Sequence, residues 1–220
     1  MAHHQYKVSY GNTRGTGNYS LAEPVRLLLI DNGIPFDDVT FTYEEWLQKF
    51  KPTMQFLQAP ALYDFDLKEQ IVQAGAILRH LGRKHDLYGD TESDKVLCDM
   101  THDAVRDLHA AYTKMIYEEY ETRDKHIKEV APPAFVLLEK FLKDRITNNG
   151  FILALGDRMC FADYILFEEL DIHYHMGKDI LKDCPTLLSY YERMCKRPNL
   201  QEYLNSEARK KRPINGNGKS

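Results

Sequence analysis

The sequence has no long apolar run. Its uncharged apolar stretches are far shorter than the roughly 20 residues that cross a bilayer as a helix, although 43% of the residues are hydrophobic and 28% charged. The first residues, Met1-Ala-His-His-Gln, lack both the basic and apolar regions of a signal peptide and the Arg-rich look of a transit peptide. We therefore expect a soluble protein of the cytoplasm.

Cysteine is scarce and unpatterned. The four cysteines, at positions 98, 160, 184 and 195, form no CxxC pair and have no zinc-site spacing, so we expect reduced thiols in a reducing compartment. Cys160 has one open alternative. It stands at the predicted start of a helix, where the pKa of a thiol is lowered, and it could therefore be a reactive thiol.

An excess of basic charge is also missing. Lys and Arg number 29 against 33 Asp and Glu, and this net charge of −4 argues against nucleic acid as a partner. The one basic run, from Arg209 to Arg212, is interpreted as a solvated tail. His173 and His175 form a His-x-His pair, but residues two apart on a helix do not share a face, so no metal site is predicted.

Two different patterns divide the chain. The first 80 or so residues alternate strand and helix signals, which predicts a βαβ unit followed by a ββα unit. Beyond the turn at Gly89-Asp90, apolar residues recur at spacings of three and four, which predicts helices only. The predicted strands are Tyr6–Tyr10, Phe36–Phe41, Ala61–Asp64 and Glu69–Ile71; the predicted helices are Ala22–Asn32, Glu44–Phe50, Ala74–Lys84, Lys95–Glu121, Pro132–Thr147, Phe161–His175 and Leu187–Lys196.

Several motifs, in this order and spacing, resemble the glutathione transferase family. They are Tyr6-Lys-Val-Ser-Tyr10, Leu21-Ala-Glu-Pro-Val-Arg26, Gln58-Ala-Pro60, the run from Gln70 to His80, the run from Gly156 to Tyr164, and Pro213-Ile-Asn-Gly-Asn-Gly-Lys219. The stretch from Asp107 to Tyr117 and the Asn-Gly-Asn-Gly tail resemble the pi class, and especially its nematode-type members.

The resemblance implies a fold with two domains. Residues 1–86 would form an α/β, thioredoxin-like domain that binds glutathione, and residues 90–220 an all-α domain that completes the site for the electrophile. It also implies a homodimer, with glutathione as co-substrate and no cofactor or metal. The implied activity is conjugation of glutathione to hydrophobic electrophiles, a detoxification reaction.

Conjugation needs a thiolate, and a free thiol with a pKa of about 8.5 is only a few per cent ionised at neutral pH. In the family a tyrosine hydroxyl at the end of the first strand stabilises the thiolate, and Tyr10 matches it. Thr16-Gly-Asn-Tyr-Ser20 lengthens the loop between Tyr10 and the first helix beyond the family's usual spacing. Tyr19 in this loop is a second candidate for the catalytic hydroxyl.

The resemblance also implies residues that hold glutathione. Trp46 and Lys51 match residues at its glycine end, and Asp107 matches a carboxylate that reaches across the dimer to its glutamyl amine. Ala74 stands where the family has a serine that binds the glutamyl carboxylate, so we expect weaker binding. The full predicted set is Trp46, Lys51, Gln58, Ala59, Pro60 (the family's cis-proline), Gln73, Ala74 and Asp107.

The implied electrophile pocket includes Gly11, Thr113 and Tyr117. Gly11 replaces the family's aromatic residue after the catalytic tyrosine and so removes one apolar wall. Phe56 matches an aromatic key that enters the partner subunit. Because Gly11, Ala74 and the longer loop depart from the family pattern, an alternative stays open: a weakly active or inactive member of the fold that serves as a binding protein (a ligandin) or as a structural, crystallin-like protein.

Overall fold

The structure is a computed structural model that describes residues 4–14, 21–143, 145 and 159–220. It divides into two compact units, one of Met1–His80 with Pro198–Lys219 and one of Leu81–Arg197 with Ser220. The predicted loop Thr16–Ser20, with the candidate Tyr19, lies outside the described residues. So do Gly156 and Asp157 of the family motif.

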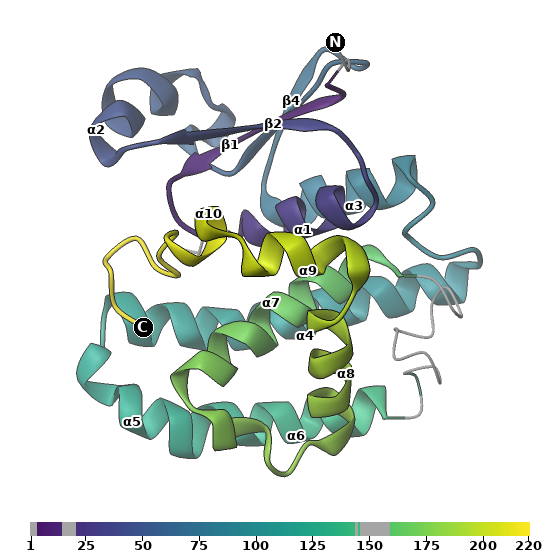
Figure 1. Cartoon of the computed structure of the whole chain (residues 1–220), viewed down its shortest axis with the longest axis vertical. Helices are drawn as coiled ribbons and strands as arrows, with labels where there is room; N and C mark the ends of the chain where they lie inside the picture. The colour runs from purple at the N-terminus through teal and green to yellow at the C-terminus, as the bar shows by residue number, and fades with distance from the viewer. Residues whose placement is uncertain (1–3, 15–20, 144, 146–158) are drawn as a thin grey trace. The chain divides into compact units, whose positions relative to one another are not determined.

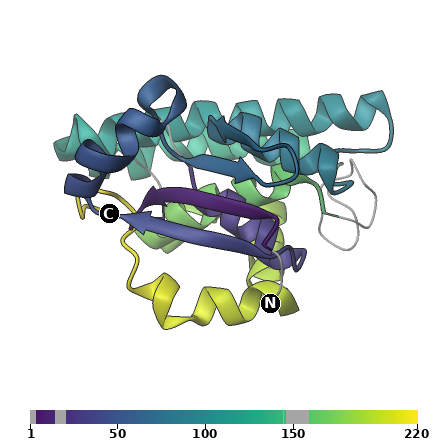
Figure 2. The same cartoon turned by 90° about the horizontal axis from the view of Figure 1, so that it is seen from above.

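The first unit is built on a four-stranded sheet. Its strands are β1 (Tyr6–Gly11), β2 (Phe36–Phe41), β3 (Ala61–Asp64) and β4 (Glu69–Val72), in the order β2-β1-β3-β4. β1 runs parallel to β2 and antiparallel to β3, and β4 is antiparallel to β3. Figure 2 shows β1 and β2 side by side. The βαβ and ββα prediction is confirmed.

Two helices cover one face of this sheet, α1 (Glu23–Asp31) and α3 (Ala74–Lys84) (Figure 1). The apolar stripe of α1, formed by Val25, Leu28 and Leu29, is fully buried, as its spacing predicts. Short turns join β2 to β3, and two further helices end the unit. These are α2 (Tyr43–Glu45), η1 (Trp46–Phe50), η2 (Lys51–Thr53), η3 (Gln55–Leu57), α9 (Pro198–Asn205) and α10 (Glu207–Lys210).

The second unit is helical, as predicted. The longest helix described in this unit is α4 (Glu92–Tyr117). Its N-cap is Thr91, which forms a capping box with Asp94; such a box satisfies two free backbone N–H groups. α4 packs against α7 (Phe161–Met176), most of which is buried. The other elements are η4 (Tyr120–Thr122), α5 (Arg123–Lys125), η5 (His126–Val130), α6 (Ala131–Leu142), η7 (Lys178–Leu181) and α8 (Pro185–Cys195).

Four buried polar side chains link the helices of the second unit. His109 Nδ1 lies 2.8 Å from a carboxylate oxygen of Glu169, and the Nε2 atoms of His126 and His173 are 3.1 Å apart. Burial and the neighbouring His173 lower the pKa of His126 to about 4. The imidazoles are thus engaged with one another and with Glu169, and the described part of the chain contains no His, Cys, Asp or Glu cluster with metal-site geometry.

Two expectations need comment. The basic run Arg209–Arg212 is not simply a solvated tail, because Arg209 is buried and pairs with Glu23 while Arg212 pairs with Asp38. Burial raises the pKa of the Cys160 thiol, which argues against a reactive cysteine there.

Within the described ranges, no helix is both long and apolar enough for a bilayer.

Candidate active site

One edge of the sheet collects most of the predicted site residues of the first unit. Because β1 and β2 are parallel while β3 is antiparallel to β1 and β4, the last residues of β1, β2 and β4 meet the first residue of β3 at this edge. The register pairs Gly11 with Phe41, Ser9 with Ala61, and Ala61 with Val72. We call this end of the sheet the site edge.

Tyr10 is the last residue but one of β1 and lies opposite Thr40 of β2. It is buried, with 8% of its surface exposed. A side chain on a paired strand inside a sheet is held more rigidly than one on a loop. The structure therefore places the predicted catalytic tyrosine on a fixed support at the site edge.

Aromatic residues support the turns that follow β2. The rings of Trp46 and Phe50 both stack on Phe41, with centroids 5.4 and 4.6 Å away. Phe41 belongs to a buried cluster with Ala61 at the start of β3. Trp46 is only half buried, as is Lys51, so both retain surface that can meet a ligand. The supporting role of Phe41 was missed from the sequence, where it is only the last residue of a predicted strand.

Gln58 and Gln73 reach one another at the site edge. Gln73 Nε2 donates a hydrogen bond to Gln58 Oε1 at 2.5 Å, and both residues are exposed. The Ala59-Pro60 peptide is cis, as the resemblance implies, and Pro60 leads directly into β3. Ala74 begins α3 immediately after Gln73, so the N-terminus of this helix and its free N–H groups lie at the same edge.

Phe56 projects from the turn just before Gln58. Its surface is 77% exposed, and its backbone φ of 53° lies in the left-handed region, which non-glycine residues seldom adopt. The backbone N–H of Gln55 donates to the side chain of Gln70 on β4 at 3.0 Å. The turn is thus tied to the sheet while an apolar ring faces solvent.

The other three predicted residues lie on α4, in the second unit. Asp107 is exposed, Tyr117 is half buried, and Thr113 is buried with its hydroxyl donating to the His109 carbonyl at 2.9 Å. Asp107 also lines a groove of about 500 Å³ between α4 and α6. The apolar side chains of this groove include Met100 and Leu137, both exposed.

Comparison with known proteins adds to this geometry. The family described as "Glutathione S-transferase, C-terminal domain" matches residues 106–207. The chain is 44% identical to a glutathione S-transferase of Dirofilaria immitis, with 97% of this chain and 99% of the relative covered. It is also 44% identical to glutathione S-transferase P of Caenorhabditis elegans, with 91% and 95% covered. The chain therefore belongs to the glutathione S-transferase family.

Comparison with solved structures agrees with this family assignment. The pi-class glutathione S-transferase of Onchocerca volvulus superposes with a TM-score of 0.89 at 43% identity, over 98% of this chain and all of the other. The resemblance to the pi class and its nematode members is thus confirmed, as is the predicted fold class.

Proposed function

We propose that this protein conjugates the thiolate of glutathione to hydrophobic electrophiles and that the Tyr10 hydroxyl stabilises the thiolate. The observation that carries the proposal is the site edge itself. A buried tyrosine at the end of β1, the Gln58–Gln73 pair and the N-terminus of α3 are neighbours there, in a chain of the glutathione S-transferase family.

The enzyme must first generate the nucleophile, which is the thiolate of glutathione. A hydroxyl that donates a hydrogen bond to the sulfur favours the charged form of the thiol. Lowering the thiol pKa by about 2 units requires about 2.7 kcal/mol of preferential interaction with the thiolate. A buried donor serves this better than an exposed one because water is not there to weaken the bond.

Residues 1–86 would bind glutathione along the site edge. The N-terminus of α3 offers backbone N–H groups and a favourable dipole to the glutamyl carboxylate, and the Gln58 and Gln73 amides suit the peptide groups. Trp46 and Lys51 would contact the glycine end. Ala74 has no hydroxyl, and one hydrogen bond to a charged group contributes about 1.5 to 3 kcal/mol, so glutathione would bind more weakly than with serine there.

Residues 90–220 would complete the electrophile site through Thr113 and Tyr117. Tyr117 ends α4, and its hydroxyl can donate a hydrogen bond to a polar electrophile. Gly11 has no side chain, so the wall of the electrophile site next to Tyr10 would stay open. The four cysteines are free thiols, which supports action in a reducing compartment such as the cytoplasm.

A homodimer is part of the proposal. Phe56 is an exposed aromatic residue, and the groove between α4 and α6 is apolar and also exposed. An aromatic anchor in a desolvated pocket is the usual energetic centre of an interface. In a two-fold dimer each Phe56 would enter the groove of the partner, which would bring Asp107 of the partner subunit toward bound glutathione.

The test is steady-state kinetics with glutathione and a chloronitrobenzene substrate, comparing wild type with Tyr10→Phe. We expect the variant to keep its unfolding temperature and lose at least tenfold in turnover, since about 1.4 kcal/mol of lost transition-state stabilisation is a factor of ten. An inactive wild type, or a variant as active as wild type, would overturn the assignment. The former result would favour the binding or structural alternative.

A further inference from the structure

The segment that follows Tyr10 is held by distant parts of the first unit. The backbone N–H of Asn12 donates to the carbonyl of Phe41 at the end of β2, at 3.2 Å. The backbone N–H of Arg14 donates to the carbonyl of Pro213, near the end of the chain, at 2.9 Å. The path of the chain on leaving Tyr10 is therefore set by a neighbouring strand and by the C-terminal segment.

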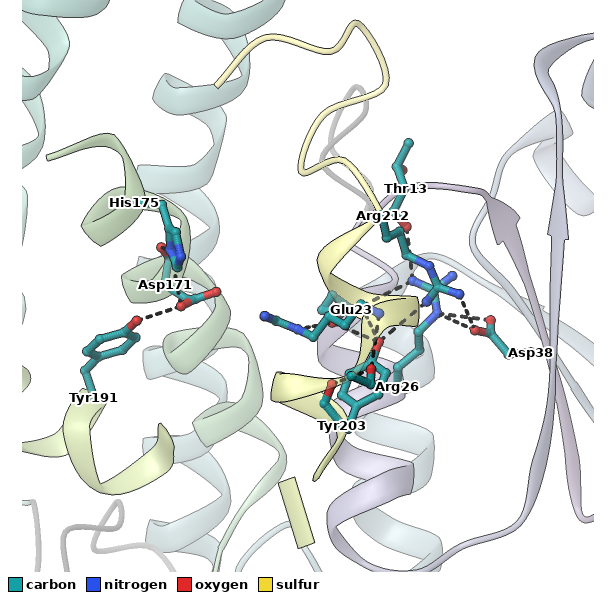
Figure 3. Close-up of polar contacts among 11 residues, drawn as sticks. Thr13, Glu23, Arg26, Asp38, Asp171, His175, Tyr191, Tyr203 and Arg212 are labelled. Carbon is teal, nitrogen blue, oxygen red and sulfur yellow. Dashed lines mark hydrogen bonds and ion pairs between the residues drawn. The ribbon is translucent and has the colours of Figure 1, made fainter. Parts of the chain in front are cut away.

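Arg26 on α1 holds the residue between these two. Its Nη1 donates to the Thr13 carbonyl at 3.2 Å, while its Nε donates to both carboxylate oxygens of Asp38 on β2, at 3.0 and 3.2 Å (Figure 3). The Arg26 side chain is fully buried. Since its planar donors are fixed at one end by Asp38, the other end holds Thr13 in one place.

The C-terminal segment is attached to Asp38 as well, and to a second carboxylate, that of Glu23 on α1. Arg212 Nη2 donates to Asp38 Oδ2 at 2.9 Å, and Arg212 directly precedes Pro213. Arg209 Nε donates to Glu23 at 2.8 Å, and the Tyr203 hydroxyl donates to the Glu23 carboxylate at 3.0 Å (Figure 3 shows Tyr203, Glu23, Asp38 and Arg212). α9, α10 and the residues up to Pro213 are thus joined to α1 and β2 by charged hydrogen bonds.

These bonds are strong because each includes at least one charged group, and those to Glu23 are also withdrawn from water. The Glu23 side chain is fully buried; burial opposes its charge, but Arg209, Arg26 and Arg14 outweigh this and hold its pKa below the usual range. A carboxylate so buried depends on every partner, whereas Asp38, with 26% of its side chain exposed, tolerates the loss of one.

We propose that Arg212, with Arg209, positions the thiolate-stabilising hydroxyl of Tyr10. The two residues anchor the C-terminal segment, and the carbonyl of Pro213 then fixes the chain just after Tyr10. The inference rests on the proposed function of Tyr10. Geometry of this kind matters because displacing a catalytic group by about 1 Å can cost about 100-fold in rate.

The test compares Arg212→Gln with wild type by the pH dependence of kcat/KM and by the ultraviolet absorbance of the bound thiolate. We expect the apparent pKa of bound glutathione to rise by at least about half a unit, which lowers the thiolate fraction about threefold at pH values below it. The loss of kcat/KM relative to wild type should disappear at high pH, where the thiol is ionised in both proteins. S-methylglutathione has no ionisable thiol. Its affinity should stay within about twofold of wild type, because the contacts that hold the rest of the tripeptide do not depend on the charge of the sulfur.

Three further variants make the result specific. Arg212→Lys keeps a cation for Asp38 and should restore most of the wild-type profile. Arg193→Gln removes the same charge from α8 of the second unit, where the arginine donates to Ser189, and should leave the profile unmoved. If Arg212→Gln does not fold, Asp38→Asn breaks the same pair from the other side; because it also removes a partner of Arg26, it should shift the apparent pKa at least as far.

The two proposals fail in different ways. A shifted profile for Tyr10→Phe with an unmoved profile for folded Arg212→Gln, or for Asp38→Asn in its place, overturns the positioning role alone. An equal shift in Arg193→Gln also overturns it. A Tyr10→Phe variant with the wild-type profile overturns the role of Tyr10 and the positioning role together.

Discussion

Gln73 donates a hydrogen bond to Gln58, fifteen positions earlier, at the edge of the sheet where Tyr10 is the last residue but one of its strand. The bond joins the turn that carries Phe56 to the residue that immediately precedes α3. Because both amides are exposed, each keeps further donors and acceptors for a ligand. The glutathione site we propose is therefore assembled before glutathione arrives, which reduces the ordering cost of binding.

The first prediction concerns the missing hydroxyl at the start of α3. Ala74→Ser should tighten glutathione binding by about 1 kcal/mol or more, that is at least about fivefold, since it adds a hydrogen bond to a charged carboxylate. Isothermal titration calorimetry measures the change. Ala76→Ser, an exposed position on the same helix, is the control and should bind like wild type. Equal or weaker affinity in Ala74→Ser would refute the assignment of this helix end.

The second prediction concerns the open wall beside Tyr10. Among the residues that the structure describes, a Cβ built on Gly11 meets only the Phe41 carbonyl oxygen, at 4.0 Å, so the first atom of a side chain has room there. Gly11→Phe should lower the KM for an apolar electrophile severalfold by burying apolar surface at about 25 cal/mol per Å², while the KM for glutathione stays constant. Gly11→Ser is the matched control with a small polar side chain. A KM for the electrophile that does not respond to Phe would mean that Gly11 does not line its pocket.

Much of this fold could be predicted from the sequence. β2, β3 and α3 begin and end at the predicted residues. Pro35 and Pro60 stand immediately before the two strands, and proline is a sharp local signal of a boundary. Helix α4 ends at Tyr117, four residues before its predicted end, since periodicity locates the body of a helix better than its ends.

The misses have a different physical cause. A run of basic residues near a chain end is normally solvated, and the partners that bury Arg209 and Arg212 lie 186 and 174 positions away. Nothing local marks Glu23 or Asp38 as those partners. In the same way, the stacking of Trp46 on Phe41 depends on how the turns after β2 fold back onto the sheet. Local pattern therefore finds the elements, while ion pairs between distant segments and ring stacks across a turn need coordinates.

The third prediction is an acid sensitivity of the helical unit. Burial and His173 lower the pKa of His126 to about 4, below the value of about 6.5 expected in the unfolded chain. The unfolded state then binds the proton more readily. The contribution of His126 to the free energy of unfolding is therefore greatest above about pH 6.5, and it falls as the pH drops toward 4. His126→Gln, which does not titrate, should lose less stability between about pH 7 and pH 5.

Urea unfolding at both pH values measures this difference. His175→Gln is the matched control: it removes an exposed histidine of α7 that pairs with Asp171. It should lose as much stability on acidification as wild type. If His126→Gln shows the same acid slope as wild type, the buried imidazole pair is not the source of the sensitivity.

The last prediction concerns the dimer. Phe56→Ala should raise the dimer dissociation constant by at least about 25-fold, because losing an interface anchor costs about 2 kcal/mol or more. Glutathione should bind more weakly in the same variant, since Asp107 of the partner subunit would no longer be held near the site. Sedimentation over a range of concentrations measures the first effect and calorimetry the second. Leu67→Ala, at an exposed apolar position in the β3–β4 turn, is the control. It should change neither the dimer dissociation constant nor the affinity for glutathione. A fully dimeric Phe56→Ala variant with normal glutathione affinity would mean that this ring does not anchor a partner.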